Sequence, residues 1–337
     1  MWEIKNRTPY SAASLWWRDQ SGVHSWIVGI KASFEFTFDG EVQLLEEQEP
    51  VTTMPTYDGD PVNPSLLYEA DILPMRPVTD VILNATAYAP NNRPAERFNA
   101  GFRVAEMSKK IELNGLRFWV STGDDQLIPG PINTVPSVPV IWQNAIGGYY
   151  CEGDDPSRHK LEPRNPCGSG AFGALGLREG DKFPQVLNID DPSQPEGLAA
   201  IPVHWQPRHR LVGTYDAHWE KNIMPLLPQD WKRESQQCAP ADQQTKSYLR
   251  GGEPIELINL TPNGRVVFTL PKIGLTCLTY HDGVEIRHRP RLVCVIIEPD
   301  HFEDKGRIMI VWNSEISVQH EIDYLERTLI QERPYAT

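Results

Sequence analysis

The sequence predicts a mainly β protein, built of antiparallel β-sandwich-like lobes with long loops and a few short helices. Thirty prolines recur along the 337 residues, and they interrupt any long helix because proline lacks a backbone donor and clashes with the preceding turn. Apolar and polar residues alternate in several short runs, which is typical of half-buried strands. Asn-Gly and Asp-Gly pairs between such runs are typical of tight hairpin turns.

The first predicted strand, residues 25–38, ends with Phe34, Phe36 and Phe38 alternating with polar residues. Asp39-Gly40 then predicts a turn into a partner strand at residues 42–45. Further strands are predicted at residues 80–87, 102–104, 109–113, 117–120, 256–260, 265–270, 284–288, 291–298 and 307–312.

Three turn signals connect these strands. Asn114-Gly115 is the strongest and predicts a hairpin between residues 109–113 and 117–120. Asn263-Gly264 and Asp282-Gly283 are signals of the same kind. Helices are predicted at residues 217–224 and 229–237, and the tail at residues 322–331 is either a helix or a strand.

The middle of the chain, residues 147–207, is rich in Gly, Pro, Asp and Asn and has little periodicity. A long segment without regular structure is uncommon in a compact domain unless its loops are functional or held by packing. We expect one domain over residues 1–337. Two β lobes within it, residues 1–150 and 200–337, would be joined by the loop-rich segment 151–199.

Charge and hydropathy exclude several classes of partner. The net charge of −13 argues against nucleic acid and anionic membranes, which are bound through clustered cations. Residues 1–11 do not resemble a secretory signal, and no apolar run reaches the roughly 20 residues that span a bilayer. We therefore expect a cytoplasmic protein that does not insert into membranes. Its five scattered cysteines form no CxxC pair, so free and mostly buried thiols are expected.

Candidate metal and nucleotide motifs are weak. His204, His209 and His218 lie near Asp216, but their spacing matches no recognised zinc motif, so we expect surface or hydrogen-bonded imidazoles. Gly168-Ser-Gly170 with a further Gly at position 173 has the GxGxxG spacing. A turn rather than a strand precedes it, so a tightly folded loop without a nucleotide is expected.

Paired acids and tryptophans leave a carbohydrate-binding or carbohydrate-active β-sandwich open as an alternative. The pairs are Asp124-Asp125, Asp154-Asp155 and Asp190-Asp191. Adjacent acids rarely flank a scissile bond, and doubled Asp is usual in solvated turns. Most of the ten tryptophans are expected in the core, and exposed ones would anchor an interface.

An ordered set of short motifs covers nearly the whole chain. It consists of residues 6–10, 31–34, 68–71, 76–81, 145–148, 164–170, 205–208, 213–216 with Trp219, 228–230, 239–243 and 310–312. This set resembles a bacterial domain family encoded in type VI secretion clusters, beside VgrG spike proteins and effectors with PAAR-like tips. Two positions depart from the family pattern, Arg76 in place of lysine and Ile146 in place of phenylalanine.

The resemblance implies a non-enzymatic adaptor or chaperone that binds an effector's PAAR-like N-terminal region and loads it onto VgrG. It implies no catalytic, cofactor or metal residues. Some positions of these motifs would either stabilise the fold or contact the partner. They are Arg164, Asn165, Pro166, Gly168, Gly170, Arg208, Gly213, Thr214, Tyr215, Asp216, Trp219, Asp242 and Gln243. A structural component of a phage-like baseplate is a further alternative.

Overall fold

A computed structural model describes residues 2–59, 64–123, 126–318 and 322–333. The protein is mainly β, as predicted, with several antiparallel sheets and a few short helices. In the described ranges, no helix combines the length and the apolar character needed to cross a membrane. All five cysteines are free thiols, and Cys238, Cys277 and Cys294 are buried.

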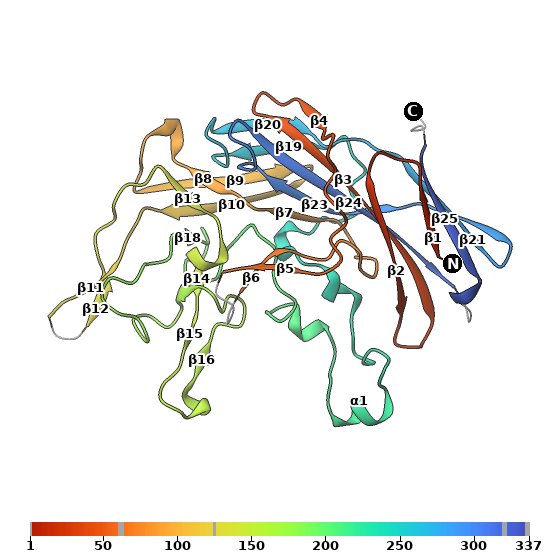
Figure 1. Cartoon of the computed structure of the whole chain (residues 1–337). Coiled ribbons are helices and arrows are strands. Elements are labelled where there is room, and N and C mark those ends of the chain that lie inside the picture. Colours follow the sequence, from red (N-terminus) through yellow and green to blue (C-terminus); the bar gives the residue numbers. More distant parts are fainter. Residues whose placement is uncertain (1, 60–63, 124–125, 319–321, 334–337) are drawn as a thin grey trace.

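The central sheet has six strands, and its long middle strands come from opposite ends of the chain (Figure 1). Within the described part of this sheet, β23 and β7 form the only parallel pair. Its members, in spatial order with β4 paired to β3, are β2 (Ser11–Arg18), β3 (His24–Thr37), β24 (Lys305–Ser317), β23 (Arg291–Glu298), β7 (Asp80–Leu83) and β4 (Val42–Leu44).

A five-stranded antiparallel sheet packs on one face of the central sheet. It contains, in order, β18 (Val186–Leu187), β10 (Met107–Asn114), β9 (Arg97–Val104), β19 (Pro254–Ile258) and β20 (Arg265–Thr269). Phe36 of β3 stacks on Phe268 of β20 with ring centroids 4.3 Å apart. Each of the two sheets therefore combines strands from residues 1–150 with strands from residues 200–337.

A four-stranded sheet extends the structure beside the central one (Figure 1). It contains, in order, β1 (Glu3–Asn6), β25 (Leu325–Glu332), β21 (Leu275–His281) and β22 (Val284–His288). The tail is thus a strand, and the helical alternative for residues 322–331 is wrong except for the short turn η7 (Ile322–Tyr324).

The remaining elements are short. Two-stranded pairs are formed by β5 (Thr56–Asp58) with β6 (Ser65–Tyr68), β8 (Thr86–Tyr88) with β13 (Ser137–Pro139), β11 (Trp119–Ser121) with β12 (Leu127–Pro129), β14 (Ile146–Gly147) with β17 (Ser169–Gly170), and β15 (Tyr149–Tyr150) with β16 (Lys160–Leu161). Helical turns are η1 (Pro90–Asn92), η2 (Trp142–Asn144), η3 (Pro156–Arg158), η4 (His209–Leu211), α1 (Ala217–Asn222), η5 (Arg233–Gln236) and η6 (Ala241–Gln243).

The central sheet is buried on both faces. Val295 and Ile297 of β23 join the core shared with the five-stranded sheet, whereas Cys294 and Ile296 pack into a second core with residues such as Ala200 and Cys238. A strand covered on both sides needs apolar residues at consecutive positions. This explains the unbroken apolar run of β23.

The predicted hairpin at Asn114-Gly115 is wrong. Strand β10 pairs with β9 and β18, and the connection between β9 and β10 is made at Ala105, whose φ of +52° is left-handed. Gly115 instead allows a close backbone approach, since a Cβ there would lie 2.0 Å from the Asn133 carbonyl oxygen. Turn signals at Asp39-Gly40, Asn263-Gly264 and Asp282-Gly283 do connect paired strands.

Two other predictions need correction. Residues 80–87 form two strands in different sheets, β7 and β8, because Leu83 hydrogen-bonds across to Leu198 and the chain then leaves the central sheet. Residues 229–237 contain only the turn η5 rather than a full helix. The predicted helix at residues 217–224 is α1, where the Asp216 carboxylate accepts from the Trp219 amide.

Candidate partner-binding surface

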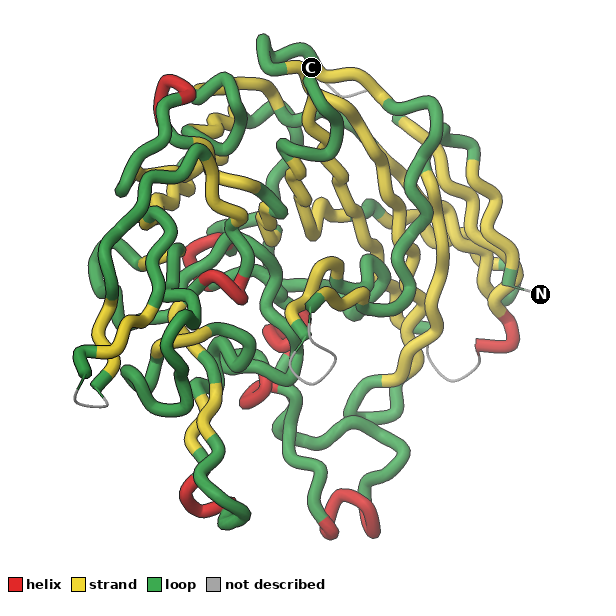
Figure 2. Tube along the Cα trace, turned by 60° about the vertical axis from the view of Figure 1, so that its left-hand side comes forward, coloured by secondary structure: helices red, strands yellow, loops and turns green. Residues whose placement is uncertain are grey.

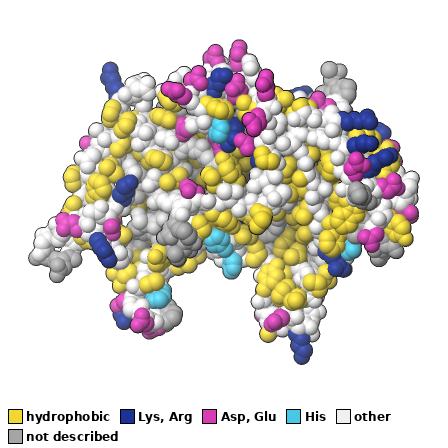
Figure 3. Space-filling model, viewed as in Figure 1, with side chains coloured by type: hydrophobic (Ala, Val, Ile, Leu, Met, Phe, Trp, Pro, Cys, Tyr) yellow, Lys and Arg dark blue, Asp and Glu magenta, His cyan; other side chains and the backbone are white. Residues whose placement is uncertain are grey.

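The loop-rich part of the chain forms a layer on the second face of the central sheet, and two arms project from it (Figures 1 and 2). We name residues 149–161, which contain β15, η3 and β16, the hairpin arm. We name residues 209–232, which contain η4 and α1, the helix arm. The surface between the arms is hollowed, and apolar side chains gather on it and on the helix arm, whereas charged side chains cover much of the tip of the hairpin arm (Figure 3).

The base of the hairpin arm is held by one buried amide. Asn165 Nδ2 donates to the carbonyl oxygens of Trp142 at 2.9 Å and Ile146 at 2.8 Å. Two glycines make room for this side chain. A Cβ at Gly168 would lie 2.4 Å from Asn165 Nδ2, and one at Gly147 would lie 2.2 Å from the Asn165 carbonyl oxygen. Asn165 and Gly168 are therefore structural residues of the arm's base.

The other motif residues here have lesser roles. Gly170 ends β17 with a φ of +80°, and Pro166 is buried. Arg164 is exposed and pairs with Glu162 at 2.7 Å. Turns follow Gly170 where a dinucleotide site would need a helix, so the GxGxxG spacing forms the loop that the sequence predicted.

Acid pairs in this region form local turns. Asp155 at the tip of the hairpin arm accepts hydrogen bonds from the amide and hydroxyl of Ser157, and these bonds lower the pKa of Asp155. Asp191 contacts Ser193 in the same way, and its pKa is also lowered. These turns match the prediction for doubled Asp. Asp124-Asp125 lies outside the described residues.

The helix arm is closed on itself by Thr214 and Asp230. The Thr214 amide and hydroxyl donate to the Asp230 carboxylate at 2.9 and 2.7 Å, and these bonds lower the pKa of Asp230. Gly213 has a φ of +91°, and a Cβ there would lie 2.7 Å from Pro228. The Trp219 indole donates to the Leu226 carbonyl at 2.9 Å.

The same arm is attached to the hairpin of β2 and β3. Gln20 Nε2 donates to three carbonyl oxygens of the arm, the shortest being that of Trp231 at 2.7 Å. The rings of Trp17 and Trp231 lie 5.6 Å apart. The attachment leaves Tyr215 at the surface, where it packs edge-on against Trp219 at 4.7 Å.

A row of rings runs from the surface into the loop layer. Tyr57, His204, Trp205 and Trp142 follow one another with centroid separations of 6.1, 6.2 and 6.0 Å. Trp142 and Trp205 are buried, and burial also lowers the pKa of His204. The described residues contain no group of three His, Cys, Asp or Glu side chains placed to hold a metal ion.

Beneath this row, Arg208 joins distant segments of the chain. Its guanidinium contacts the buried Glu69 carboxylate at 2.7 Å, the Ile201 carbonyl at 2.6 Å and the Ser235 carbonyl at 3.0 Å. Gln243 joins the loop layer to the central sheet, because it donates to the carbonyls of Val81 at 2.8 Å and Leu198 at 2.9 Å.

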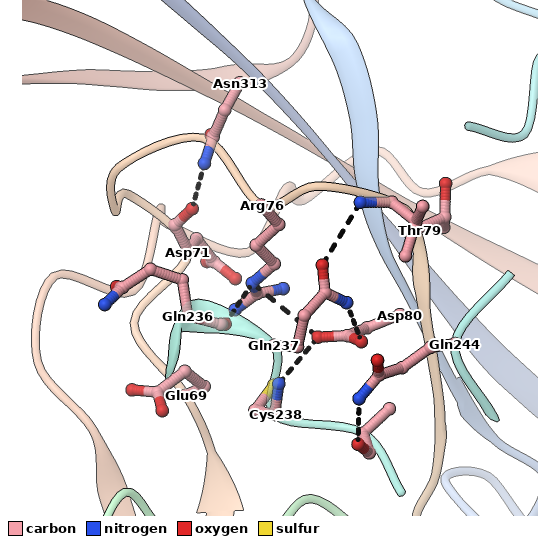
Figure 4. A network of polar contacts seen from close by, with 12 residues as sticks. Glu69, Asp71, Arg76, Thr79, Asp80, Gln236, Gln237, Cys238, Gln244 and Asn313 are labelled. Carbon is pink, nitrogen blue, oxygen red and sulfur yellow. Dashed lines mark hydrogen bonds and ion pairs between the residues drawn. The ribbon is translucent and has the colours of Figure 1, made fainter. Parts of the chain in front are cut away.

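Figure 4 shows the adjoining network around Arg76 and Asp80. Arg76 Nε donates to the Gln236 carbonyl at 2.9 Å and lies 3.7 Å from the Asp80 carboxylate. Asp80 also accepts from the Cys238 amide at 2.8 Å. Burial raises the pKa of Asp80, whereas Arg76 opposes that shift. Arg76, which stands where the family pattern has lysine, is a charged donor in a nearly fully buried site.

The motif residues therefore do not form one site. Asn165, Arg208 and Gln243 are buried hydrogen-bonding residues of the loop layer, while Asp242 is exposed and pairs with the buried Lys109 at 2.9 Å. Gly213, Thr214, Asp216 and Trp219 shape the helix arm, and Tyr215 is its exposed ring. Sequence reasoning did not select Glu69 and Asp230 as site residues, although both lie within the quoted motifs.

Four exposed apolar side chains lie on the arms, and of these Tyr215 is a motif position, whereas the other three were not selected because exposure is not visible in a sequence. Strands β15 and β16 place two of them directly opposite one another, since Tyr149 pairs with Leu161. The four exposed fractions are 53% for Tyr149, 53% for Leu161, 52% for Tyr215 and 60% for Met224.

Comparison with known proteins places the chain in a family. Residues 21–313 match the family described as "Uncharacterized protein conserved in bacteria (DUF2169)". No curated protein and no solved structure matches the chain. The family match covers most of the central sheet, the five-stranded sheet and both arms. The chain therefore belongs to the DUF2169 family of bacterial proteins.

Proposed function

We propose that this protein is a non-enzymatic cytoplasmic adaptor. It would bind the PAAR-like N-terminal region of a type VI secretion effector and promote loading of that effector onto VgrG. The observation that carries the proposal is the exposed apolar side chains of the two arms, beside the hollow between them (Figure 3). Grouped exposed apolar residues mark interaction sites, because water contact with such side chains is unfavourable.

The arms suit partner binding for a second reason. The row from Tyr57 to Trp142 and the Arg208 contacts hold the surface between the arms in place. Tyr149 and Tyr215 then present aromatic rings, which commonly dominate the energy of protein interfaces. A firmly held surface loses little entropy on binding. The identity of the partner rests on the resemblance of the ordered motifs to type VI adaptors.

Copurification tests the proposal. The full chain is coexpressed with the effector encoded beside it, and the complex is measured by affinity capture and titration. We expect Tyr149→Ser combined with Tyr215→Ser to weaken binding by at least about tenfold, because both rings would be interface anchors. Val267→Ser is the matched control, since Val267 is also exposed but lies on β20, away from both arms. Its effect should stay below about twofold.

Two results would contradict the proposal. One is an effector that remains soluble and associated with VgrG when this protein is deleted. The other is a complex that forms with equal affinity after both tyrosines are replaced. Circular dichroism of each variant separates loss of binding from loss of folding.

A further inference from the structure

A cavity of about 430 Å³ lies where the four-stranded sheet meets the central sheet. Its lining comes from residues 273–275 at the start of β21, residues 289–292 at the start of β23, Trp312 of β24 and Arg333 after β25, together with residues 247–250. Leu249, Leu275, Leu292 and Trp312 are buried apolar residues of this lining. The volume falls within the range of small-molecule sites. No residue of either arm contributes to it.

The charge of this cavity is opposite to that of the protein. Four arginines line it, Arg250, Arg289, Arg291 and Arg333, and no Asp or Glu among the described residues contributes to the lining. The chain as a whole carries a net charge of −13. Cations gathered at the walls of one cavity make the potential there locally positive, which attracts an anion.

Three of these arginines have no carboxylate partner in the part of the chain that the structure describes. No ion pair within the described ranges involves Arg289, Arg291 or Arg333. Arg333 Nε is buried and has no hydrogen-bond partner among those residues. Arg291 lies over the Tyr248 ring at 5.9 Å, which orients its guanidinium without neutralising it. A buried donor without a partner is unfavourable until an acceptor enters.

We propose that this cavity binds an oxyanion group, carboxylate or phosphate, that is attached to an apolar group. Arginine presents parallel N–H donors that match the oxygen pairs of carboxylates and phosphates. The apolar part of the ligand would contact the leucine and tryptophan walls. This inference is independent of the proposed adaptor role, because it uses neither arm.

Calorimetric titration of the full chain tests the site with defined probes. Phenyl phosphate and an N-acetylated, C-amidated Phe-Glu dipeptide carry both features, whereas inorganic phosphate and benzyl alcohol each carry one. We expect at least one of the first two to bind at least about tenfold more tightly than the last two. The tighter of the two shows whether the oxyanion comes from a phosphate ester or a peptide side chain.

Variants locate the binding. Arg289→Gln combined with Arg291→Gln should weaken binding by at least about tenfold, since both side chains are exposed at the cavity and their removal spares the buried walls. Arg287→Gln is the matched control, because Arg287 is an exposed cation on the adjacent strand β22 but does not line the cavity. Binding should also weaken with added salt.

Either of two results would overturn the proposal. In one, neither bifunctional probe binds at millimolar concentration. In the other, binding is equally affected by Arg287→Gln and by the double substitution, which would indicate a diffuse electrostatic effect. Because the assay contains no effector, failure here leaves the adaptor proposal untouched, and failure of effector capture leaves this site untouched.

Discussion

The two faces of the central sheet are covered by very different structures. One face packs against the five-stranded sheet through apolar residues such as Phe36 and Phe268. The other face is covered by the loop layer, which is tied down by buried polar groups such as Arg208, Asn165 and Gln243. Regular strands satisfy their own backbone groups, whereas loops need side chains to do so. This contrast explains why the motif residues gather in the loop layer.

Breaking the Arg208–Glu69 ion pair is expected to have the largest effect on the stability of the loop layer. Arg208→Met leaves the Glu69 carboxylate buried without its cation, and we expect a loss of about 3–5 kcal/mol in the free energy of unfolding. Adding Glu69→Leu should recover most of that loss, because the carboxylate left without its cation is then removed. Urea denaturation of both variants measures the difference.

Arg164→Met is the matched control for that experiment. Its ion pair with Glu162 is exposed on the arginine side, and exposed pairs contribute about 0–1 kcal/mol. Equal effects at Arg208 and Arg164 would show that the loop layer does not depend on its buried ion pair.

A half-buried histidine, His288, provides a test of the sheets instead. His288 of β22 is hydrogen-bonded to Ser314 of β24 at 2.5 Å and to Thr279 at 2.8 Å, and burial lowers its pKa to about 4. The unfolded chain therefore binds a proton at higher pH than the folded one. Stability is complete above about pH 6.5 and falls as the pH drops toward 4, by up to about 3 kcal/mol.

Thermal unfolding between pH 7 and pH 4 measures this dependence. His288→Asn should show a shallower fall than the unsubstituted chain, while His218→Asn, at an exposed position on the helix arm, should leave the fall unchanged. Identical pH profiles for all three proteins would exclude His288 as a source of acid sensitivity.

The smallest expected effect is at the base of the hairpin arm. Asn165→Ala removes two hydrogen bonds to buried backbone carbonyls, with an expected cost of about 1–3 kcal/mol. Hydrogen exchange should rise first at residues 145–148 and 165–170, because the loss is local.

Asn133→Ala provides the control, since this exposed side chain makes one bond of 3.3 Å to Leu116. Its cost should stay below about 0.5 kcal/mol. If exchange rose equally in the central sheet after Asn165→Ala, the loop layer and the sheets would be one cooperative unit instead of two.

Prediction succeeded where the signal is local. Residues 284–288 and 291–298 are strands at the predicted positions, and Asp282 and Gly283 both adopt the positive φ that their hairpin requires. Strand β2 and the tail strand β25 were missed or left open, because they are partly exposed and lack clean alternation. The Asn114-Gly115 signal predicted a hairpin wrongly. Asn114 is buried, and Gly115 instead allows the backbone at Asn133 to approach closely.

The sequence by itself determined the β-rich class, the turns with left-handed residues, the acidic surface and the ordered motifs, because each depends on neighbouring residues or on composition. Tertiary structure alone decided what those motifs do. Arg208 meets Glu69 across 139 residues of chain, and the four arginines of the cavity come from three separate segments. Such contacts depend on how the sheets bring distant segments together, and no local pattern encodes that arrangement.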